Sequence, residues 1–181
     1  EVAAALKAPL GLVLVRKIGA PKQPELALGA VADGGHPTTI LNDDTVRSLG
    51  VPESFIQEEI RRKLDEIERR RDLYLKGRPQ VDISGRTAIV VDDGIATGAT
   101  VRAALQSVRR SAPASLVLAV PVAPVEALDS LKAEADEVVC LATPSPFWAI
   151  SMFYWMFEQL TDREVFDWLK RAADLHAQIG R

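Results

Sequence analysis

The chain has 181 residues, of which 22 are lysine or arginine and 25 are aspartate or glutamate, a net charge of -3. With 48% hydrophobic and 26% charged residues, it has the composition of a folded domain rather than a disordered chain. The mild acidity argues against general nucleic-acid binding. The longest apolar run, 147–157, is about half of the ~20 residues that a membrane span needs. The single cysteine, Cys140, favours a reducing, cytoplasmic setting without disulfides.

Aliphatic and β-branched runs bounded by turn residues predict the strands. In chain order these strands are 12–15, 26–31, 38–41, 87–91, 116–120 and 137–141. The first is expected to end at Arg16 and Lys17 and to be followed by a loop over 18–24, which contains two prolines. The second and third flank residues 33–37, whose Asp-Gly-Gly-His-Pro sequence is typical of a hairpin turn.

Helical periodicity and capping signals predict the helices. In chain order these helices are 2–7, 54–76, 100–110, 125–132 and a last one after Thr161. The second is highly charged with one narrow apolar stripe, and Gly77 with Pro79 would end it. The last opens with a capping box that runs from Thr161 to Glu164.

From residue 87 onward, strands and helices alternate with short connections, which predicts βαβ units. We therefore expect the α/β class, with a Rossmann-like and mostly parallel sheet flanked by helices and a hairpin-and-helix hood insertion. One domain is expected over 1–181, in which 36–80 is a lid or hood. A static structural or dimer-forming role is the alternative for the long helix of that insertion.

The stretch from Val90 to Thr100 is the part of the sequence that most clearly indicates a ligand-binding site. An apolar strand ends in two adjacent carboxylates, Asp92 and Asp93, and a loop of small residues leads from them into a helix. Open backbone N–H groups, threonine hydroxyls and the helix N-terminus favour a phosphate. Ionised carboxylates only accept hydrogen bonds, so the acid pair suits a vicinal diol. A sugar phosphate meets both demands.

This stretch resembles the signature of type I phosphoribosyltransferases, which bind 5-phosphoribosyl-1-pyrophosphate (PRPP) with Mg²⁺. The resemblance implies that the acid pair holds the ribose hydroxyls and that 96–100 holds the 5′-phosphate. It also implies transfer of the phosphoribosyl group to a nitrogen acceptor such as a nucleobase, with release of pyrophosphate. Mg²⁺ would be carried by PRPP rather than bound by the protein directly. The residues assigned to PRPP are Asp92, Asp93, Gly94, Ile95, Ala96, Thr97, Gly98, Ala99, Thr100, Arg16 and Lys17.

Arg16 and Lys17 resemble the basic loop that reaches pyrophosphate in adenine phosphoribosyltransferases. Cations placed there would neutralise the charge that develops on the leaving pyrophosphate, which makes Lys17 a catalytic candidate beside Asp92 and Asp93. A solvated strand end is the alternative. The runs 15–21 and 29–31 also resemble bacterial members, so the resemblance covers nearly the whole chain.

Phe147 and Trp148 follow the last predicted strand and resemble the loop that stacks the base in purine-type members. An aromatic core or a contact between the subunits of a homodimer, running on to Phe157, is the alternative.

Two departures from the family pattern support a second hypothesis, a regulatory protein that binds PRPP or a nucleotide without catalysis. Ala96 replaces an aspartate that acts as the base in some purine members, and Met156 stands where an acidic residue is expected. The family's first strand and its Pro-Arg-Gly-Gly pyrophosphate loop would lie ahead of Glu1. A small-molecule kinase or receiver-like domain is a third, less favoured hypothesis, since no Gly-Lys-Ser/Thr follows Gly94.

Overall fold

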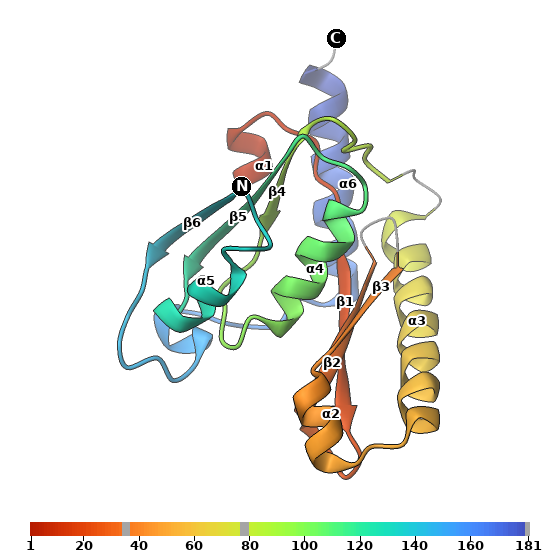
Figure 1. Ribbon diagram of the computed structural model, residues 1–181. Coiled ribbons are helices and arrows are strands. Elements are labelled where there is room, and N and C mark those ends of the chain that lie inside the picture. The colour runs from red at the N-terminus through yellow and green to blue at the C-terminus, as the bar shows by residue number, and fades with distance from the viewer. Residues whose placement is uncertain (34–36, 77–79, 180–181) are drawn as a thin grey trace.

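The computed structural model describes residues 1–33, 37–76 and 80–179 (Figure 1). The middle of the predicted hairpin turn, 34–36, and the predicted helix-ending residues Gly77 and Pro79 lie outside the described residues. The strands are β1 Leu14–Ala20, β2 Gln23–Asp33, β3 Pro37–Leu41, β4 Thr87–Val91, β5 Ser115–Val122 and β6 Glu137–Ala142. The helices are α1 Val2–Ala5, α2 Asp43–Leu49, α3 Glu53–Leu75, α4 Ala99–Arg109, α5 Val125–Leu131, the short 3-10 helix η1 Ile150–Phe153, and α6 Asp162–Ile179.

The strands form two sheets, and together they confirm the predicted α/β class. The parallel sheet has the order β4-β5-β6, with Ala88 opposite Leu116 and Leu118 opposite Val138. The second sheet has the order β1-β2-β3 and is antiparallel, so the predicted hairpin is confirmed as the β2–β3 pair and forms the hood. The parallel order puts the carboxyl ends of β4, β5 and β6 at one edge (Figure 1).

The prediction that the first strand ends at Arg16 and Lys17 is wrong, because β1 continues to Ala20 and β2 begins at Gln23. Antiparallel pairing with β2 overrides the local loop signals in this segment. The register shifts at Gly19, where an added Cβ would lie only 2.6 Å from the carbonyl oxygen of Pro24. The glycine and the proline therefore accommodate an irregular strand pair rather than a loop.

Helix α4 lies between the two sheets, because it contacts β1, β2 and β3 on one side and β4 and β5 on the other. The long helix α3 covers the opposite face of the antiparallel sheet and packs against α6 (Figure 1). Its predicted apolar stripe is confirmed: Ile56 and Ile67 are fully buried, and Ile60 and Leu64 pack against the core that contains Ile67. Whether this helix acts as a lid stays a prediction.

The capping box of α6 is confirmed by its hydrogen bonds. The backbone N–H of Thr161 donates to the Glu164 carboxylate at 2.8 Å, and the Glu164 N–H donates to Thr161 Oγ1 at 3.3 Å. None of the helices in the described ranges combines the length and the apolar character that a membrane span requires.

Candidate functional site

The acid pair lies where β4 leaves the parallel sheet. The N–H of Asp92 still donates to the carbonyl of Ala119 on β5, at 3.4 Å, and the N–H of Ile95 donates to the carbonyl of Val122 at 3.0 Å. Gly94 and Ile95 are buried, whereas Asp93 is exposed. The loop therefore follows the end of β5 with its apolar residues inward and presents an acidic side chain to solvent.

The second half of the loop forms an anion-binding start for α4. Gly98 is the N-cap of α4 with φ 80°, a left-handed conformation that favours glycine, and no side chain caps the helix. The first N–H groups of an α-helix have no partner within the helix. Ala96, Thr97 and Thr100 are exposed around this end. Open N–H groups and the helix dipole make it suitable for a phosphate.

Burial raises the pKa of both aspartates above the ordinary value, and for Asp92 the charge of Asp93 adds to the effect. One hydrogen bond opposes the shift at Asp92: its Oδ1 accepts the N–H of Asp93 at 3.0 Å. Within the described residues, no cation contributes to the pKa of either group. The pair thus carries negative charge that hydroxyl donors or a cation from a ligand would compensate.

A pocket of about 420 Å³ opens beside this loop. Ala96 and Thr97 line one side, Glu126 lines another at the start of α5, and Phe147 and Trp148 line the side formed by the segment after β6. The structure thus brings the predicted phosphate loop and the predicted base-binding aromatics to one pocket, although they are about 50 residues apart in the chain.

Two residues that the sequence did not single out connect the segment after β6 to the acid pair. The Tyr154 hydroxyl donates to the backbone carbonyl of Asp93 at 2.6 Å. Ile150 lies against Gly94, where an added Cβ would be 2.8 Å from its Cγ2 atom. Burial, and then the charges of the two carboxylates, raise the pKa of Tyr154. No local signal marks this tyrosine, because it lies inside an apolar run that suggests a core or an interface.

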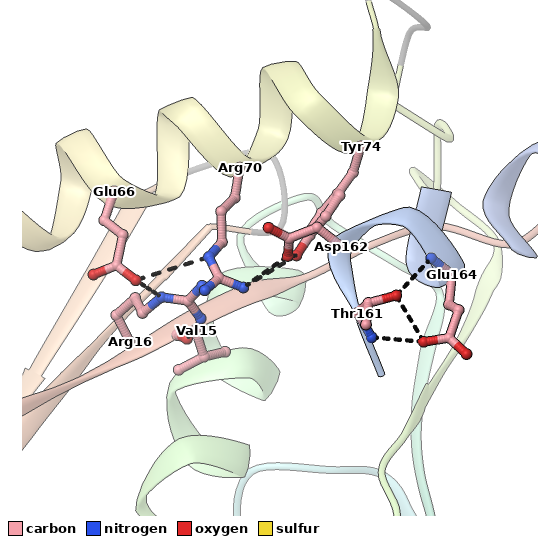
Figure 2. Close-up of polar contacts among 8 residues, drawn as sticks. All are labelled: Val15, Arg16, Glu66, Arg70, Tyr74, Thr161, Asp162 and Glu164. Carbon is pink, nitrogen blue, oxygen red and sulfur yellow. Dashed lines mark hydrogen bonds and ion pairs between the residues drawn. The ribbon is translucent and has the colours of Figure 1, made fainter. Parts of the chain in front are cut away.

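The structure does not bring Arg16 to the acid loop. Its Nε donates to the Glu66 carboxylate of α3 at 2.6 Å, and Nη1 donates to the carbonyl of Val15 (Figure 2). Leu14 and Ile18, two residues away on either side, are buried in the core formed with α3. Arg16 therefore belongs to the α3 face of β1, and its role at pyrophosphate stays a prediction.

Lys17 belongs to the opposite face, because successive strand residues alternate. It is exposed and pairs in register with Ala30, which packs against Ala103 of α4. The two neighbouring cations thus point to opposite faces of the antiparallel sheet, and only Lys17 shares the side of α4.

The segment after β6 also exposes a large apolar surface. Its exposed residues are Trp148, Met152, Phe153, Trp155, Met156, Phe157 and Leu160, and Leu141 near the end of β6 is exposed as well. Trp148 is 76% exposed and lines the pocket, while Trp155 is fully exposed and does not. Phe147 stacks on Phe153 with 5.1 Å between ring centroids.

The described part of the chain contains no group of three or more His, Cys, Asp or Glu side chains that could hold a metal ion by itself. Asp92 and Asp93 offer carboxylate oxygens, the type of ligand that Mg²⁺ prefers. Mg²⁺ commonly keeps most of its ligands as water or substrate oxygens and binds protein through one or two carboxylates. The acid pair therefore fits a Mg²⁺ ion that arrives with a phosphorylated substrate.

Residues 25–157, which include the acid pair, the anion loop and most of the exposed apolar segment, match the family described as the phosphoribosyl transferase domain. The chain belongs to this family. Two Mycobacterium tuberculosis proteins, from strains CDC 1551 and H37Rv, are each named "Putative phosphoribosyl transferase" and are 44% identical to this chain over 180 residues. The alignment covers 99% of this phosphoribosyl transferase chain and 40% of each relative, so the chain spans less than half of their length.

A solved structure shows the same fold as this phosphoribosyl transferase domain. The crystal structure of TT1426 from Thermus thermophilus matches it with a TM-score of 0.75 and 42% sequence identity. The match covers 94% of this chain and 79% of TT1426. The parallel sheet and the antiparallel hood therefore belong to an arrangement found in a solved protein.

Proposed function

We propose that this phosphoribosyl transferase domain binds PRPP with Mg²⁺ and transfers the phosphoribosyl group to a nitrogen acceptor, a nucleobase, releasing pyrophosphate. One observation carries the proposal: the β4–α4 loop joins the two adjacent carboxylates to a helix N-terminus that no side chain caps, beside a pocket lined by Phe147 and Trp148. Membership of the family supports the same conclusion.

The acid pair would bind the ribose. Asp92 and Asp93 would accept hydrogen bonds from its 2′- and 3′-hydroxyls, which supply the donors that the two carboxylates lack. In the transfer, the bond from C1 to the pyrophosphate oxygen breaks with its electron pair leaving on pyrophosphate. The acceptor nitrogen forms the new bond to C1 with its own lone pair and loses its proton to water. Positive charge develops on the ring, and the nearby carboxylates stabilise it.

The phosphates would be held by different parts of the chain. The N–H groups and hydroxyls of residues 96–100 would bind the 5′-phosphate. Lys17 is the cation that we assign to pyrophosphate, because it lies on the α4 side of β1, whereas Arg16 lies on the α3 side. Mg²⁺ would be carried by PRPP and would neutralise the pyrophosphate charge, with the carboxylates of Asp92 and Asp93 nearby rather than as its main ligands.

The acceptor would occupy the pocket. A volume of about 420 Å³ is within the usual size of small-molecule sites, roughly 300–1,000 Å³. The exposed indole of Trp148 offers a face on which a planar base can stack. Glu126 is the one ionisable side chain among the described residues that line the pocket, so it would accept a hydrogen bond from a ring or amino N–H of the base.

A regulatory PRPP-binding protein is the second candidate. Ala96 lines the pocket, and its side chain cannot act as a base. Met156 is exposed and supplies no acidic group. Both candidates share the ribose-phosphate site, and they differ only in whether transfer follows binding. The exposed apolar segment after β6 supports a homodimer under either candidate, and a cytoplasmic setting remains the prediction from the cysteine content.

The test has two steps on the full-length protein. Isothermal titration with PRPP and Mg²⁺ measures binding, and Asp93→Asn should weaken it strongly because an amide presents one acceptor instead of two. Pyrophosphate release is then followed with a panel of purine and pyrimidine bases. Binding without release for every base would establish the regulatory candidate, and absence of PRPP binding by the wild-type protein would contradict both.

A further inference from the structure

The backbone of Asp93 is held on both sides. Its N–H donates to Asp92 Oδ1 at 3.0 Å, and its carbonyl accepts the hydroxyl of Tyr154 at 2.6 Å. The first bond is local, whereas the second comes from a residue 61 positions along the chain. When the backbone N–H and C=O of an exposed loop residue are both engaged, its peptide planes are held in place, and this fixes the direction in which the Cα–Cβ bond points.

A second contact joins the same two segments one residue further along. Ile150 packs on Gly94 so closely that an added Cβ would lie 2.8 Å from its Cγ2 atom. Ile150 begins η1 and Tyr154 directly follows it, so this short helix spans the two contacts. Phe153 of η1 stacks on Phe147, which lines the pocket. A continuous set of contacts therefore runs from the pocket wall to the backbone of the acid pair.

We propose that Tyr154 is a positioning residue that holds Asp93 in the orientation that binds the ribose diol and couples the aromatic wall of the acceptor pocket to the ribose site. This role rests on the proposed function. Tyr154 acts through the Asp93 carbonyl that its hydroxyl binds. Because coupling between two sites is reciprocal, an acceptor that orders the aromatic wall also tightens the binding of PRPP.

The electrostatics agree with a neutral donor at this position. Burial and the two neighbouring carboxylates raise the pKa of Tyr154, so the hydroxyl keeps its proton at neutral pH and continues to donate. Tyr154 is half-buried, with its ring against Phe157 at 5.1 Å between centroids, so removal of the hydroxyl leaves the ring packing in place.

The chain offers a matched control because it has only two tyrosines. The Tyr74 hydroxyl donates to Asp162 at 2.5 Å, between α3 and α6 and on elements that carry none of the pocket residues (Figure 2). Tyr154→Phe and Tyr74→Phe each remove one hydroxyl, and Tyr74→Phe also removes the bond that this hydroxyl accepts from Arg70 at 3.0 Å. Only the first removes a bond to the acid pair.

Two measurements on the full-length variants test the role. Hydrogen–deuterium exchange of a peptide that covers 92–98, without ligand, should be faster in Tyr154→Phe than in the wild type and unchanged in Tyr74→Phe. The dissociation constant for PRPP with Mg²⁺ should rise about threefold to tenfold in Tyr154→Phe, the usual effect of one hydrogen bond, and stay at the wild-type value in Tyr74→Phe.

The outcomes separate this role from the proposed function. In one outcome, exchange is faster in Tyr154→Phe but the wild-type protein binds no PRPP. The bond from Tyr154 would then still restrain the Asp93 backbone, but the proposed function and the role of Asp93 at the ribose would both be overturned. Wild-type exchange and wild-type PRPP affinity in Tyr154→Phe would overturn the positioning role and leave the proposed function standing. Equal losses of affinity in both variants would also overturn it, because the loss would then reflect general stability.

Discussion

Ile150 occupies the space next to Gly94, where a Cβ would stand 2.8 Å from its Cγ2 atom. The carbonyl oxygen of Val122 would lie 3.1 Å from the same Cβ, and it cannot easily retreat because it accepts the N–H of Ile95. We therefore expect Gly94→Ala to push the segment after β6 away from the acid loop. The cost in the free energy of unfolding should be about 1–3 kcal/mol, as for other overpacked sites, and PRPP affinity should fall as well.

Gly11→Ala is the matched control for this substitution. An added Cβ there meets only Val81, at 3.9 Å, which is ordinary van der Waals contact. Urea unfolding followed by circular dichroism should show a clear loss for Gly94→Ala and almost none for Gly11→Ala. Equal stability and equal PRPP affinity in both variants would show that the contact between Gly94 and Ile150 has no consequence.

The two exposed tryptophans of the segment after β6 should behave differently. Trp148→Ala removes the indole that lines the pocket, so the KM for the acceptor base should rise roughly threefold to tenfold, the usual effect of losing an aromatic stack. Trp155 is fully exposed and does not line the pocket, so Trp155→Ala should leave that KM unchanged. Steady-state kinetics with the best base from the panel measures both values, and a shift of similar size in the two variants would contradict the assignment of Trp148.

Substitution of the two neighbouring cations of β1 should have different effects, one on stability and the other on catalysis. Arg16→Met leaves Glu66 without its 2.6 Å partner, although Lys63 and Arg70 remain within 3.8 Å, so the free energy of unfolding should fall by about 1–2 kcal/mol. Lys17→Met changes a side chain on the α4 side instead and should lower kcat/KM for PRPP with a smaller effect on stability. The reverse pattern, with Arg16→Met impaired in catalysis at full stability, would assign the pyrophosphate to Arg16.

The parts of the site that are contiguous in the chain could be predicted from the sequence. A β-branched run, two aspartates, a small-residue loop and a helix follow one another from 87 to 109, and β4 and α4 begin and end within a residue of the predicted bounds. Helix α2 was not predicted although it has a local signal, since Asn42 accepts the N–H of Thr45 at 3.1 Å as an N-cap.

The remaining features depend on pairings between distant residues. The bond from Tyr154 to Asp93 requires the path of the chain after β6, and the pair of Arg16 with Glu66 requires α3 to lie on β1. Gly19 and Pro24 are residues typical of loops, but the pairing of β1 with β2 keeps this segment in the strands. Propensity and turn chemistry act within a few residues, so none of these three outcomes could be read from local sequence.

Asp136 should make the stability of the parallel sheet depend on pH. Its carboxylate accepts two hydrogen bonds from Arg109, at 2.8 and 3.1 Å, and one from the N–H of Leu116 at 2.7 Å, and these bonds hold its pKa below the ordinary value. A depressed pKa in the folded state gives stability that is present above the unfolded pKa of about 3.9 and is lost as the pH falls through the folded pKa. Asp136→Asn should therefore lower the urea midpoint at pH 7, and the difference from the wild type should shrink below about pH 4.

Asp129→Asn is the control, because it breaks only an exposed pair with Lys132, three residues away. It should change the urea midpoint little at any pH. A constant difference between Asp136→Asn and the wild type from pH 7 to pH 3 would show that the carboxylate charge contributes nothing there.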